Sequence, residues 1–262
     1  MAASTPAQLL FGKVAAITGG ATGIGRAIAL EYLRQGAFVA VNHLADEESE
    51  KHFASLVAEA GAGIRLIGVA GDISLPDTAK HLVTVTVREF SRLDVFVSNA
   101  GICQFADFLT LDTDLFDATV ATNLSGAFYA VQAAAQQMVS QGGGGSIIGI
   151  SSISALVGGT QQTHYTPTKA GVLSLMQSCA CALGKYNIRC NAILPGTIRT
   201  QLNEKDLEND KKRRYTEARI PLGRTGLPED LGGPAVFLAS DMSQYVTGAQ
   251  LLVDGGLFVN LQ

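Results

Sequence analysis

The sequence predicts an α/β fold in which helices cover both faces of a doubly wound parallel sheet of about seven strands. Short apolar runs alternate with longer helical stretches from one end of the chain to the other, which is the pattern of a parallel sheet. Several of these runs are almost wholly apolar, as strands that are buried on both faces are. No repeat or linker interrupts the alternation, so we expect one domain over residues 1–262.

Each element is expected where its pattern is strongest. Strands are expected at Lys13–Thr18, Phe38–His43, Ile64–Val69, Leu93–Ser98, Ser146–Ser151, Ile188–Leu194 and Gln250–Val253. Helices are expected at about Gly23–Gln35, Glu47–Ala60, Pro76–Ser91, Thr113–Ser140 and Thr163–Tyr186, with two more within Asn203–Thr216 and Pro228–Ser240.

The composition argues against several classes of protein. A net charge of −4 disfavours a nucleic-acid surface, and no apolar run reaches the roughly 18 residues of a membrane span. No secretory signal is apparent at the start of the sequence. Neither the four cysteines nor the four histidines show the spacing of a disulfide framework or a metal site. We therefore expect reduced thiols, no catalytic metal and a cytoplasmic location.

A glycine-rich turn, Thr18–Gly25, joins the first expected strand to the first expected helix. Gly19 can make the tight turn, and Gly23 lets the backbone approach a pyrophosphate that then sits on the helix N-terminus. Gly25 permits close packing of helix on strand, and Thr22 and Ile24 complete the turn. In this position the turn predicts a dinucleotide site.

Tyr165 and Lys169 are four residues apart, so a helix places both side chains on one face. Ser152 stands where the apolar run Ile147–Ile150 ends. A free tyrosine has a pKa of about 10, which is too high for a general base near neutrality. An ammonium about 6 Å away would lower that pKa by about two units, and a bound oxidised nicotinamide would add a second positive charge. Tyr165 is then the expected base and Ser152 holds the substrate oxygen; the plain alternative is a surface lysine near a helix start.

These motifs together resemble the short-chain dehydrogenase/reductase family. After the glycine-rich turn come, in order, Asn99-Ala100-Gly101, Asn123, Ser152, Tyr165-x-x-x-Lys169 and Pro195-Gly196. The resemblance extends from about Gly12 to Gly256 and implies a Rossmann-type dehydrogenase that uses a nicotinamide cofactor. It also implies a homotetramer, assembled through the helices near 113–140 and 163–186 and through the last strand.

The resemblance assigns residues to the adenosine half of that cofactor. Asn99, followed by Gly101, would hold the ribose side and steady the central strand, while Asp72 and Ile73 would touch the adenine. Asp72 could equally be a turn residue.

At the nicotinamide half, the resemblance gives Lys169 the ribose hydroxyls. Asn123 would hold a water that links Lys169 to solvent, although it could instead cap or kink a helix. Ile198 and Thr200 would contact the carboxamide.

The choice between NAD and NADP depends on the end of the second strand, which reads Asn42-His43 and offers no carboxylate for a ribose 2′-hydroxyl. Asp46 comes three residues late, and Thr22 stands where many NADP enzymes carry Arg. Asn42 or His43 could tolerate a 2′-phosphate. We expect use of both NADP and NAD, with a preference for NADP.

Substrate specificity is expected in a lid over about residues 197–226, which Pro195-Gly196 and Gly223 could bound. The runs Ser151–Gly159 and Thr163–Gly171 resemble sugar 1-dehydrogenases of the family, which implies oxidation of the anomeric hydroxyl of an L-sugar to a lactone. Because sugar recognition needs several directed hydrogen bonds, the candidate substrate contacts are polar. They are Gln104, Ser152, Ser154, Gln162, His164, Tyr165, Thr197 and Asn203.

Three alternatives remain open at this point. The first is another hexose 1-dehydrogenase, and the second is a carbonyl or 3-oxoacyl reductase acting in the reverse direction. The third is a nucleotide sensor without catalysis, which would be expected to lack Tyr165 or Lys169.

Overall fold

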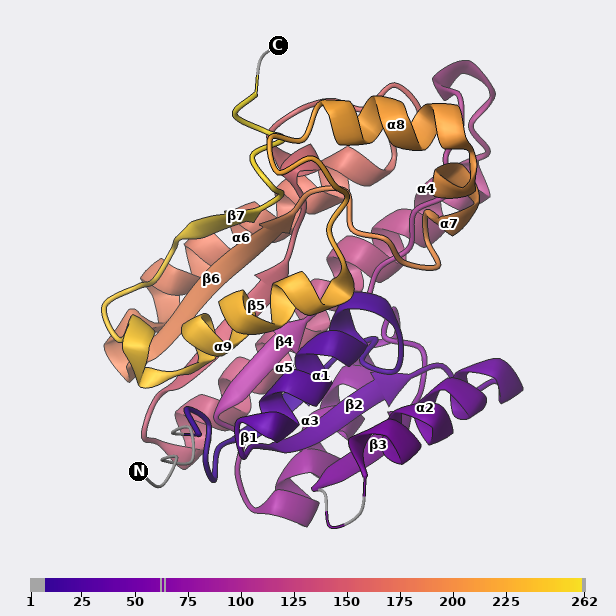
Figure 1. Ribbon diagram of the computed structural model, residues 1–262. Helices are drawn as coiled ribbons and strands as arrows, with labels where there is room; N and C mark the ends of the chain where they lie inside the picture. The colour runs from indigo at the N-terminus through magenta and orange to yellow at the C-terminus, as the bar shows by residue number, and fades with distance from the viewer. Residues whose placement is uncertain (1–7, 62, 64, 261–262) are drawn as a thin grey trace, which may run out of the picture.

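Seven parallel strands form one sheet in the order β3-β2-β1-β4-β5-β6-β7 in the computed structural model, which describes residues 8–61, 63 and 65–260 (Figure 1). The strands are β1 Val14–Ile17, β2 Phe38–His43, β3 Leu66–Ala70, β4 Val95–Ser98, β5 Gly145–Ile150, β6 Ile188–Pro195 and β7 Gln250–Val253. Ile64, the expected start of the third strand, lies outside the described residues. The predicted fold class is confirmed.

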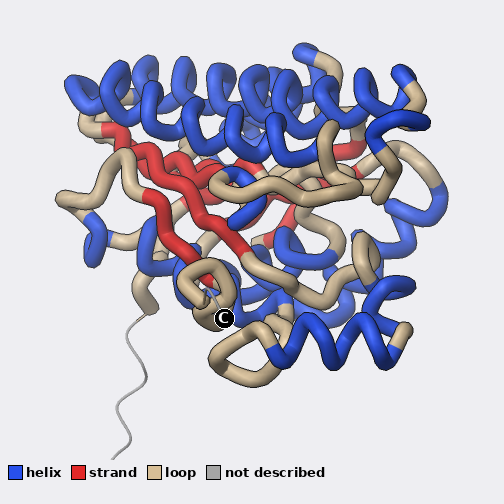
Figure 2. Tube along the Cα trace, turned by 90° about the horizontal axis from the view of Figure 1, so that it is seen from above, coloured by secondary structure: helices blue, strands red, loops and turns tan. Residues whose placement is uncertain are grey.

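Helices cover both faces of the sheet, as Figure 2 shows from above. One face packs against α3 (Pro76–Phe90), α5 (Gly126–Gln141) and α6 (Tyr165–Leu183). The other packs against α1 (Gly23–Arg34), α2 (Glu47–Ala60) and α9 (Gly232–Ala239). The remaining helices are α4 Thr113–Val120, α7 Glu204–Glu208 and α8 Asp210–Ala218, with 3₁₀ turns at Phe108–Thr110, Ile153–Ala155, Gly184–Tyr186, Pro228–Leu231 and Asp241–Ser243.

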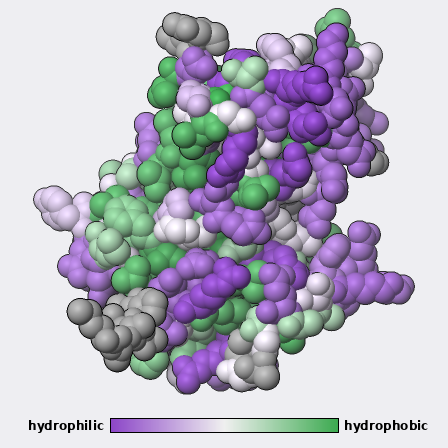
Figure 3. Space-filling view, viewed as in Figure 1, coloured by the Kyte–Doolittle hydropathy of each residue, from purple (hydrophilic) through white to green (hydrophobic). Residues whose placement is uncertain are grey.

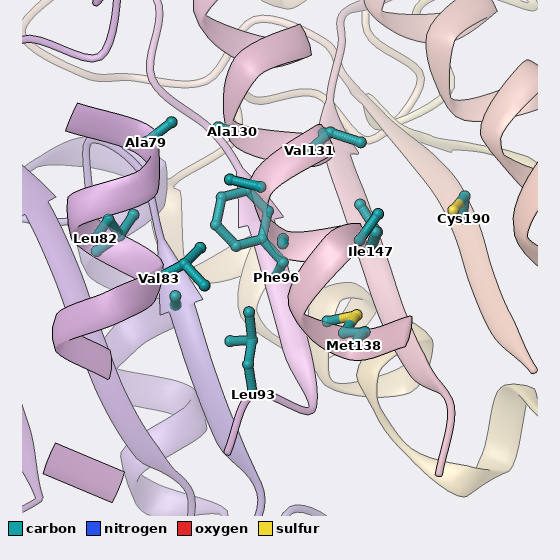
Figure 4. Close-up of a cluster of buried hydrophobic side chains, with 14 of the residues drawn as sticks. Ala79, Leu82, Val83, Leu93, Phe96, Ala130, Val131, Met138, Ile147 and Cys190 are labelled. Atoms are coloured by element: carbon teal, nitrogen blue, oxygen red, sulfur yellow. The ribbon is translucent and has the colours of Figure 1, made fainter. Parts of the chain in front are cut away.

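The buried core follows from this layering. Figure 4 shows Phe96 of β4 between Leu82 of α3 and Val131 of α5, and all three side chains are almost fully removed from solvent. Burial of one such side chain contributes about 1.5–3 kcal/mol. Among the described helices, none combines the length and apolar character needed to cross a membrane.

The single helix expected over Thr113–Ser140 is interrupted. A π-helical turn at Ala121–Ser125 separates α4 from α5, and it carries Asn123. The Asn123 Oδ1 accepts a hydrogen bond from the backbone N of Ile102 at 2.8 Å, and its Nδ2 donates to the backbone O of Ile102 at 2.9 Å. π-turns of this kind often occur at functional sites. In this wide turn the Asn123 amide contacts the loop after β4. The periodicity of apolar residues in the sequence does not reveal such a turn.

The strand order reverses between β1 and β4, the two strands at the centre of the sheet. In open parallel sheets, ligands bind outside the carboxyl ends of the strands at this reversal. The glycine-rich turn follows β1, and the Asn99–Gly101 loop follows β4. The topology therefore brings the two predicted cofactor motifs to one edge.

Candidate active site

A cavity of about 820 Å³ opens at the carboxyl ends of the strands. Nineteen of the residues predicted from sequence line it: Gly19, Thr22, Gly23, Ile24, Asn42, His43, Asp72, Ile73, Asn99, Gly101, Ser152, Ser154, Gln162, Tyr165, Lys169, Thr197, Ile198, Thr200 and Asn203. Four predicted residues, Gly25, Gln104, Asn123 and His164, do not line it.

The glycine-rich turn forms an open cradle at one end of this cavity. Gly19 and Gly23 adopt positive φ values of 60° and 53°, which favour glycine. A Cβ on Gly25 would lie 2.4 Å from the carbonyl O of Gly19 and 2.5 Å from Nδ2 of Asn99. Gly25 therefore acts by allowing close packing behind the turn. The bare backbone in front fits a cofactor pyrophosphate at the start of α1.

Asn99 ties the cradle to the central strands. Its Nδ2 donates to the carbonyl oxygens of Thr18 and Gly19 at 2.9 and 3.0 Å, and its backbone N donates to Thr18 Oγ1 at 2.9 Å. These bonds explain why an amide stands here: one side chain fixes the turn after β1 to the end of β4.

At the adenosine end, the two polar residues that close β2 are partly used within the protein. The Asn42 Nδ2 donates to the carbonyl oxygens of Val69 and Gly71 at 3.2 and 2.9 Å. The His43 ring stacks on Phe53 with ring centroids 5.1 Å apart, and its Nδ1 lies 2.9 Å from the Leu44 carbonyl O. The Asn42 Nδ2 and the His43 Nδ1 therefore already have partners within the protein, and binding of a 2′-phosphate by these two residues stays a prediction.

Ser152, Tyr165 and Lys169 converge at the end of β5. Tyr165 begins α6, and the Lys169 Nζ lies 5.6 Å from its ring centroid. The same Nζ donates to the carbonyl O of Ile150 at 3.0 Å, which draws the lysine against the strand end. Ser152 Oγ accepts from the Ser154 backbone N at 3.0 Å, and a side-chain hydrogen bond links Ser152 to Tyr165.

Burial governs the protonation of this group. It lowers the pKa of Lys169 to about 8, against an opposing effect of the Cys103 thiol. Burial also raises the pKa of Tyr165, the Cys103 thiol adds to the rise, and the Ser152 hydrogen bond opposes it. In the cofactor-free protein, burial of the phenol therefore sets the direction of the shift, and the lowering of the Tyr165 pKa by Lys169 together with a bound nicotinamide stays a prediction. A bound oxidised nicotinamide carries the further positive charge that favours the tyrosinate.

Asn123 lies behind the cavity wall, next to Lys169. A Cβ on Gly101 would lie 3.2 Å from Asn123 Oδ1 and 3.4 Å from Lys169 Nζ, so both groups flank this glycine. The Asn123 Nδ2 also lies 3.3 Å from Thr168 Oγ1. This position is compatible with a water held between Asn123 and Lys169, as the family resemblance implies.

Two of the predicted sugar contacts lie outside the cavity, and a third is already bonded to the protein backbone. His164, the residue just before α6, is fully buried and does not line the cavity. Gln104 is exposed outside the cavity. Asn203 reaches the lining, but its Oδ1 accepts from the Thr200 backbone N and its Nδ2 donates to the Ile198 carbonyl O. Asn203 therefore fixes the backbone at residues 198 and 200.

The structure also adds lining residues that were not predicted. On α8, Lys212, Tyr215 and Thr216 line the cavity. Their i, i+3, i+4 spacing marks one helix face and could have been read from the sequence. Cys103 also lines the cavity, with its Sγ 3.5 Å from Gln162 Nε2. No spacing rule would have indicated that contact, because it joins two loops.

Comparison with known proteins supports one family. The family model described as enoyl-(acyl carrier protein) reductase matches residues 19–258. L-rhamnose-1-dehydrogenase of Scheffersomyces stipitis is 66% identical over 97% of this chain and 99% of its own. L-rhamnose 1-dehydrogenase (NAD(P)(+)) of a Sphingomonas species is 59% identical over 97% and 100%. A short-chain type dehydrogenase/reductase from Mycobacterium marinum superposes with a TM-score of 0.89 at 36% identity, covering 95% of this chain and 97% of that one. Together with the cradle and the Ser152, Tyr165 and Lys169 group, these matches establish that the chain belongs to the short-chain dehydrogenase/reductase family of NAD(P)-dependent oxidoreductases.

Proposed function

We propose that this chain oxidises the anomeric C1 hydroxyl of L-rhamnose, or of a related L-sugar such as L-mannose or L-lyxose, to the aldonolactone with NADP or NAD. The observation that carries the proposal is the convergence of Ser152, Tyr165 and Lys169 on one cavity. The printed names of two relatives at 66% and 59% identity supply the substrate.

The cofactor would lie along the cavity, with its pyrophosphate on the turn at Gly19 and Gly23 and its nicotinamide near Tyr165 and Ile198. When bound, the oxidised nicotinamide supplies the acceptor for the hydride that leaves the sugar C1. The residues that hold the cofactor are proposed from the lining of the cavity and from the absence of side chains at the glycine cradle.

The protein's own residues handle the proton. Ser152 Oγ holds the C1 oxygen by a hydrogen bond while Tyr165 Oη removes its proton. The Lys169 ammonium, whose pKa burial lowers to about 8, stabilises the tyrosinate and passes a proton toward the water proposed beside Asn123. Ser154, Gln162 and Thr197 also line the cavity, and the proposal assigns the remaining sugar hydroxyls to them.

The proposal includes a substrate lid over about residues 197–226. Thr197, Leu202 and Tyr215 from this segment all line the cavity. The anchoring of Asn203 to the backbone at 198 and 200 supports a fixed hinge at its start.

Two other functions are less well supported. A 3-oxoacyl reductase or another hexose 1-dehydrogenase would use the same Tyr165 and Lys169, so chemistry alone does not separate them. The printed names of the two relatives favour oxidation of L-rhamnose. A sensor without catalysis is disfavoured because Ser152, Tyr165 and Lys169 are all present and brought together.

The test is cofactor reduction by purified protein with L-rhamnose, L-mannose, L-lyxose, L-fucose and D-glucose, using NADP and NAD separately. Strong turnover with L-rhamnose and its stereochemical neighbours is the expected result. Absence of turnover with every sugar, together with oxidation of the reduced cofactor by an oxoacyl or diketone substrate, would replace the sugar by a keto substrate.

We also propose a homotetramer in the cytoplasm. A shallow groove on the outer face of α5 and α6 is lined by Leu124, Ser125, Phe128, Tyr129, Gly171, Ser174, Leu175 and Ser178, and the Phe128 side chain is 46% exposed. Figure 3 shows apolar surface over β7 and the C-terminal segment and polar surface over α2 and α8. A monomeric mass in light scattering would contradict the assembly. The cytoplasmic location is supported by four cysteines that form no disulfide with one another.

A further inference from the structure

The adenosine end of the cavity contains a polar residue that the sequence motifs do not single out. Ser49, in the first turn of α2, lines the cavity together with Asn42, His43 and Leu44. Its Oγ donates a hydrogen bond to Asp46 Oδ2 at 3.0 Å, and its backbone N donates to Asp46 Oδ1 at 2.8 Å. Ser49 is half-buried and Asp46 is exposed.

The direction of this hydrogen bond decides what Ser49 can offer to a ligand. A serine hydroxyl has one hydrogen and two acceptor lone pairs. Because the hydrogen is directed at Asp46, Oγ has only lone pairs left to offer to a ligand in the cavity. A ribose 2′-hydroxyl can donate to those lone pairs, whereas a 2′-phosphate has only acceptor oxygens under most conditions and needs a donor.

The charge of Asp46 acts in the same direction. The backbone N–H of Ser49 is the largest cause of a lowered pKa for this carboxyl, so it is ionised at neutral pH. Its side chain caps α2, and Glu47, Glu48 and Glu50 follow in the first turn. A 2′-phosphate beside Ser49 would therefore meet like charge, while a hydroxyl would not.

We propose that Asp46 acts through Ser49 as this chain's acidic determinant of cofactor choice, favouring the 2′-hydroxyl of NAD over the 2′-phosphate of NADP. The sequence has no carboxylate at the end of β2 to bind the ribose 2′-hydroxyl. Asp46 and Ser49, at the start of α2, would bind it instead. NADP remains usable because an exposed charge is screened by salt. The inference rests on the proposed placement of the cofactor, not on the sugar.

The experiment measures binding of two cofactor fragments by calorimetry without sugar or turnover. The fragments are 5′-AMP and adenosine 2′,5′-bisphosphate, which differ at the 2′ position. The variant Asp46→Asn keeps a good helix cap and removes the charge. The matched control is Glu47→Gln, an equally exposed acid on the same turn that pairs with Lys51 at 2.6 Å.

Asp46→Asn should tighten the bisphosphate about fivefold at low salt and leave 5′-AMP within about twofold, because only the bisphosphate places a phosphate at the 2′ position, near the lost charge. The gain should shrink at about 0.5 M salt, which a merely structural effect would not do. Ser49→Ala should weaken 5′-AMP severalfold through the lost hydrogen bond.

Three results would overturn the proposal. The first is an unchanged ratio of the two affinities in Asp46→Asn, and the second is an equal change for both fragments. The third is a Glu47→Gln effect as large as that of Asp46→Asn, which would assign the preference to the general field of the helix start. If wild type bound neither fragment, the cofactor placement itself would be wrong, whereas failure of the sugar assay would leave this result untouched.

Discussion

Lys169→Met should make the protein inactive and, at neutral pH, more stable. Lys169 is 5% exposed, and its Nζ has one backbone partner, the Ile150 carbonyl O at 3.0 Å. A buried ammonium with so few partners is costly. Methionine has a similar length and no charge, so it removes the cost while keeping most of the packing.

The magnitude follows from the pKa. Burial lowers the pKa of Lys169 from 10.5 to about 8, and each pKa unit corresponds to about 1.4 kcal/mol, so keeping the charge costs about 3 kcal/mol below pH 8. Between about pH 8 and 10.5 the unfolded chain binds more protons than the folded one, so wild-type stability rises with pH in this window. In Lys169→Met, loss of the hydrogen bond to Ile150 costs about 1 kcal/mol of the stability regained by removing the buried charge. The free energy of unfolding should therefore rise by about 2 kcal/mol at pH 7.

Thermal unfolding of cofactor-free protein measures this gain. A chain of this size shifts by about 2 °C per kcal/mol, so the Tm of Lys169→Met should exceed that of wild type by about 4 °C at pH 7 and lose most of that margin near pH 10. Lys80→Met, at an exposed lysine, serves as the control and should show no such pH-dependent difference. A Tm below wild type at pH 7, or a margin that does not change with pH, would refute the assignment of the cost to a buried charge.

Three further predictions concern single groups of the site. Tyr165→Phe should reduce turnover by at least about a hundredfold while calorimetry finds 5′-AMP binding unchanged; normal turnover would show that another group is the base. Gly25→Ala should destabilise the fold by about 1–3 kcal/mol in denaturant titrations and weaken 5′-AMP binding. The reason is that the added Cβ would lie 2.4 Å from the Gly19 carbonyl O. Stability and binding equal to those of wild type would contradict this prediction. Asn123→Ala should lower the free energy of unfolding by about 2 kcal/mol, because it leaves both backbone groups of Ile102 without their partner. The same variant should slow turnover more than it raises the KM for sugar. An equal effect on both would point to a purely structural role.

The sheet and the cofactor cradle were predictable because they depend on local patterns. Apolar runs that are buried on both faces identify β1, β4 and β5, and the glycines of the Thr18–Gly25 turn identify the dinucleotide site between strand and helix. The order of the strands places the site at the reversal between β1 and β4 once the parallel sheet is accepted.

The parts that the sequence did not reveal depend on contacts between distant segments. The π-turn carries Asn123, whose amide is hydrogen-bonded to the backbone of Ile102, 21 residues away. The pKa of Tyr165 depends on how deeply α6 buries the phenol, which no spacing rule reports. His164 was predicted as a sugar ligand from its residue type, but it precedes α6 as the N-cap residue and is fully buried. Residue type indicates chemistry, whereas direction and burial decide which residues take part.

The most direct test of the proposed function follows a C1 deuterium from L-rhamnose. In wild type, mass spectrometry of the reduced cofactor should find the deuterium on the nicotinamide, with the lactone as co-product and a slower initial rate than with unlabelled sugar. Tyr165→Phe should form neither product at a comparable rate. Reduced cofactor without deuterium, or no transfer from L-rhamnose while an oxoacyl substrate is reduced, would contradict the proposed oxidation at C1.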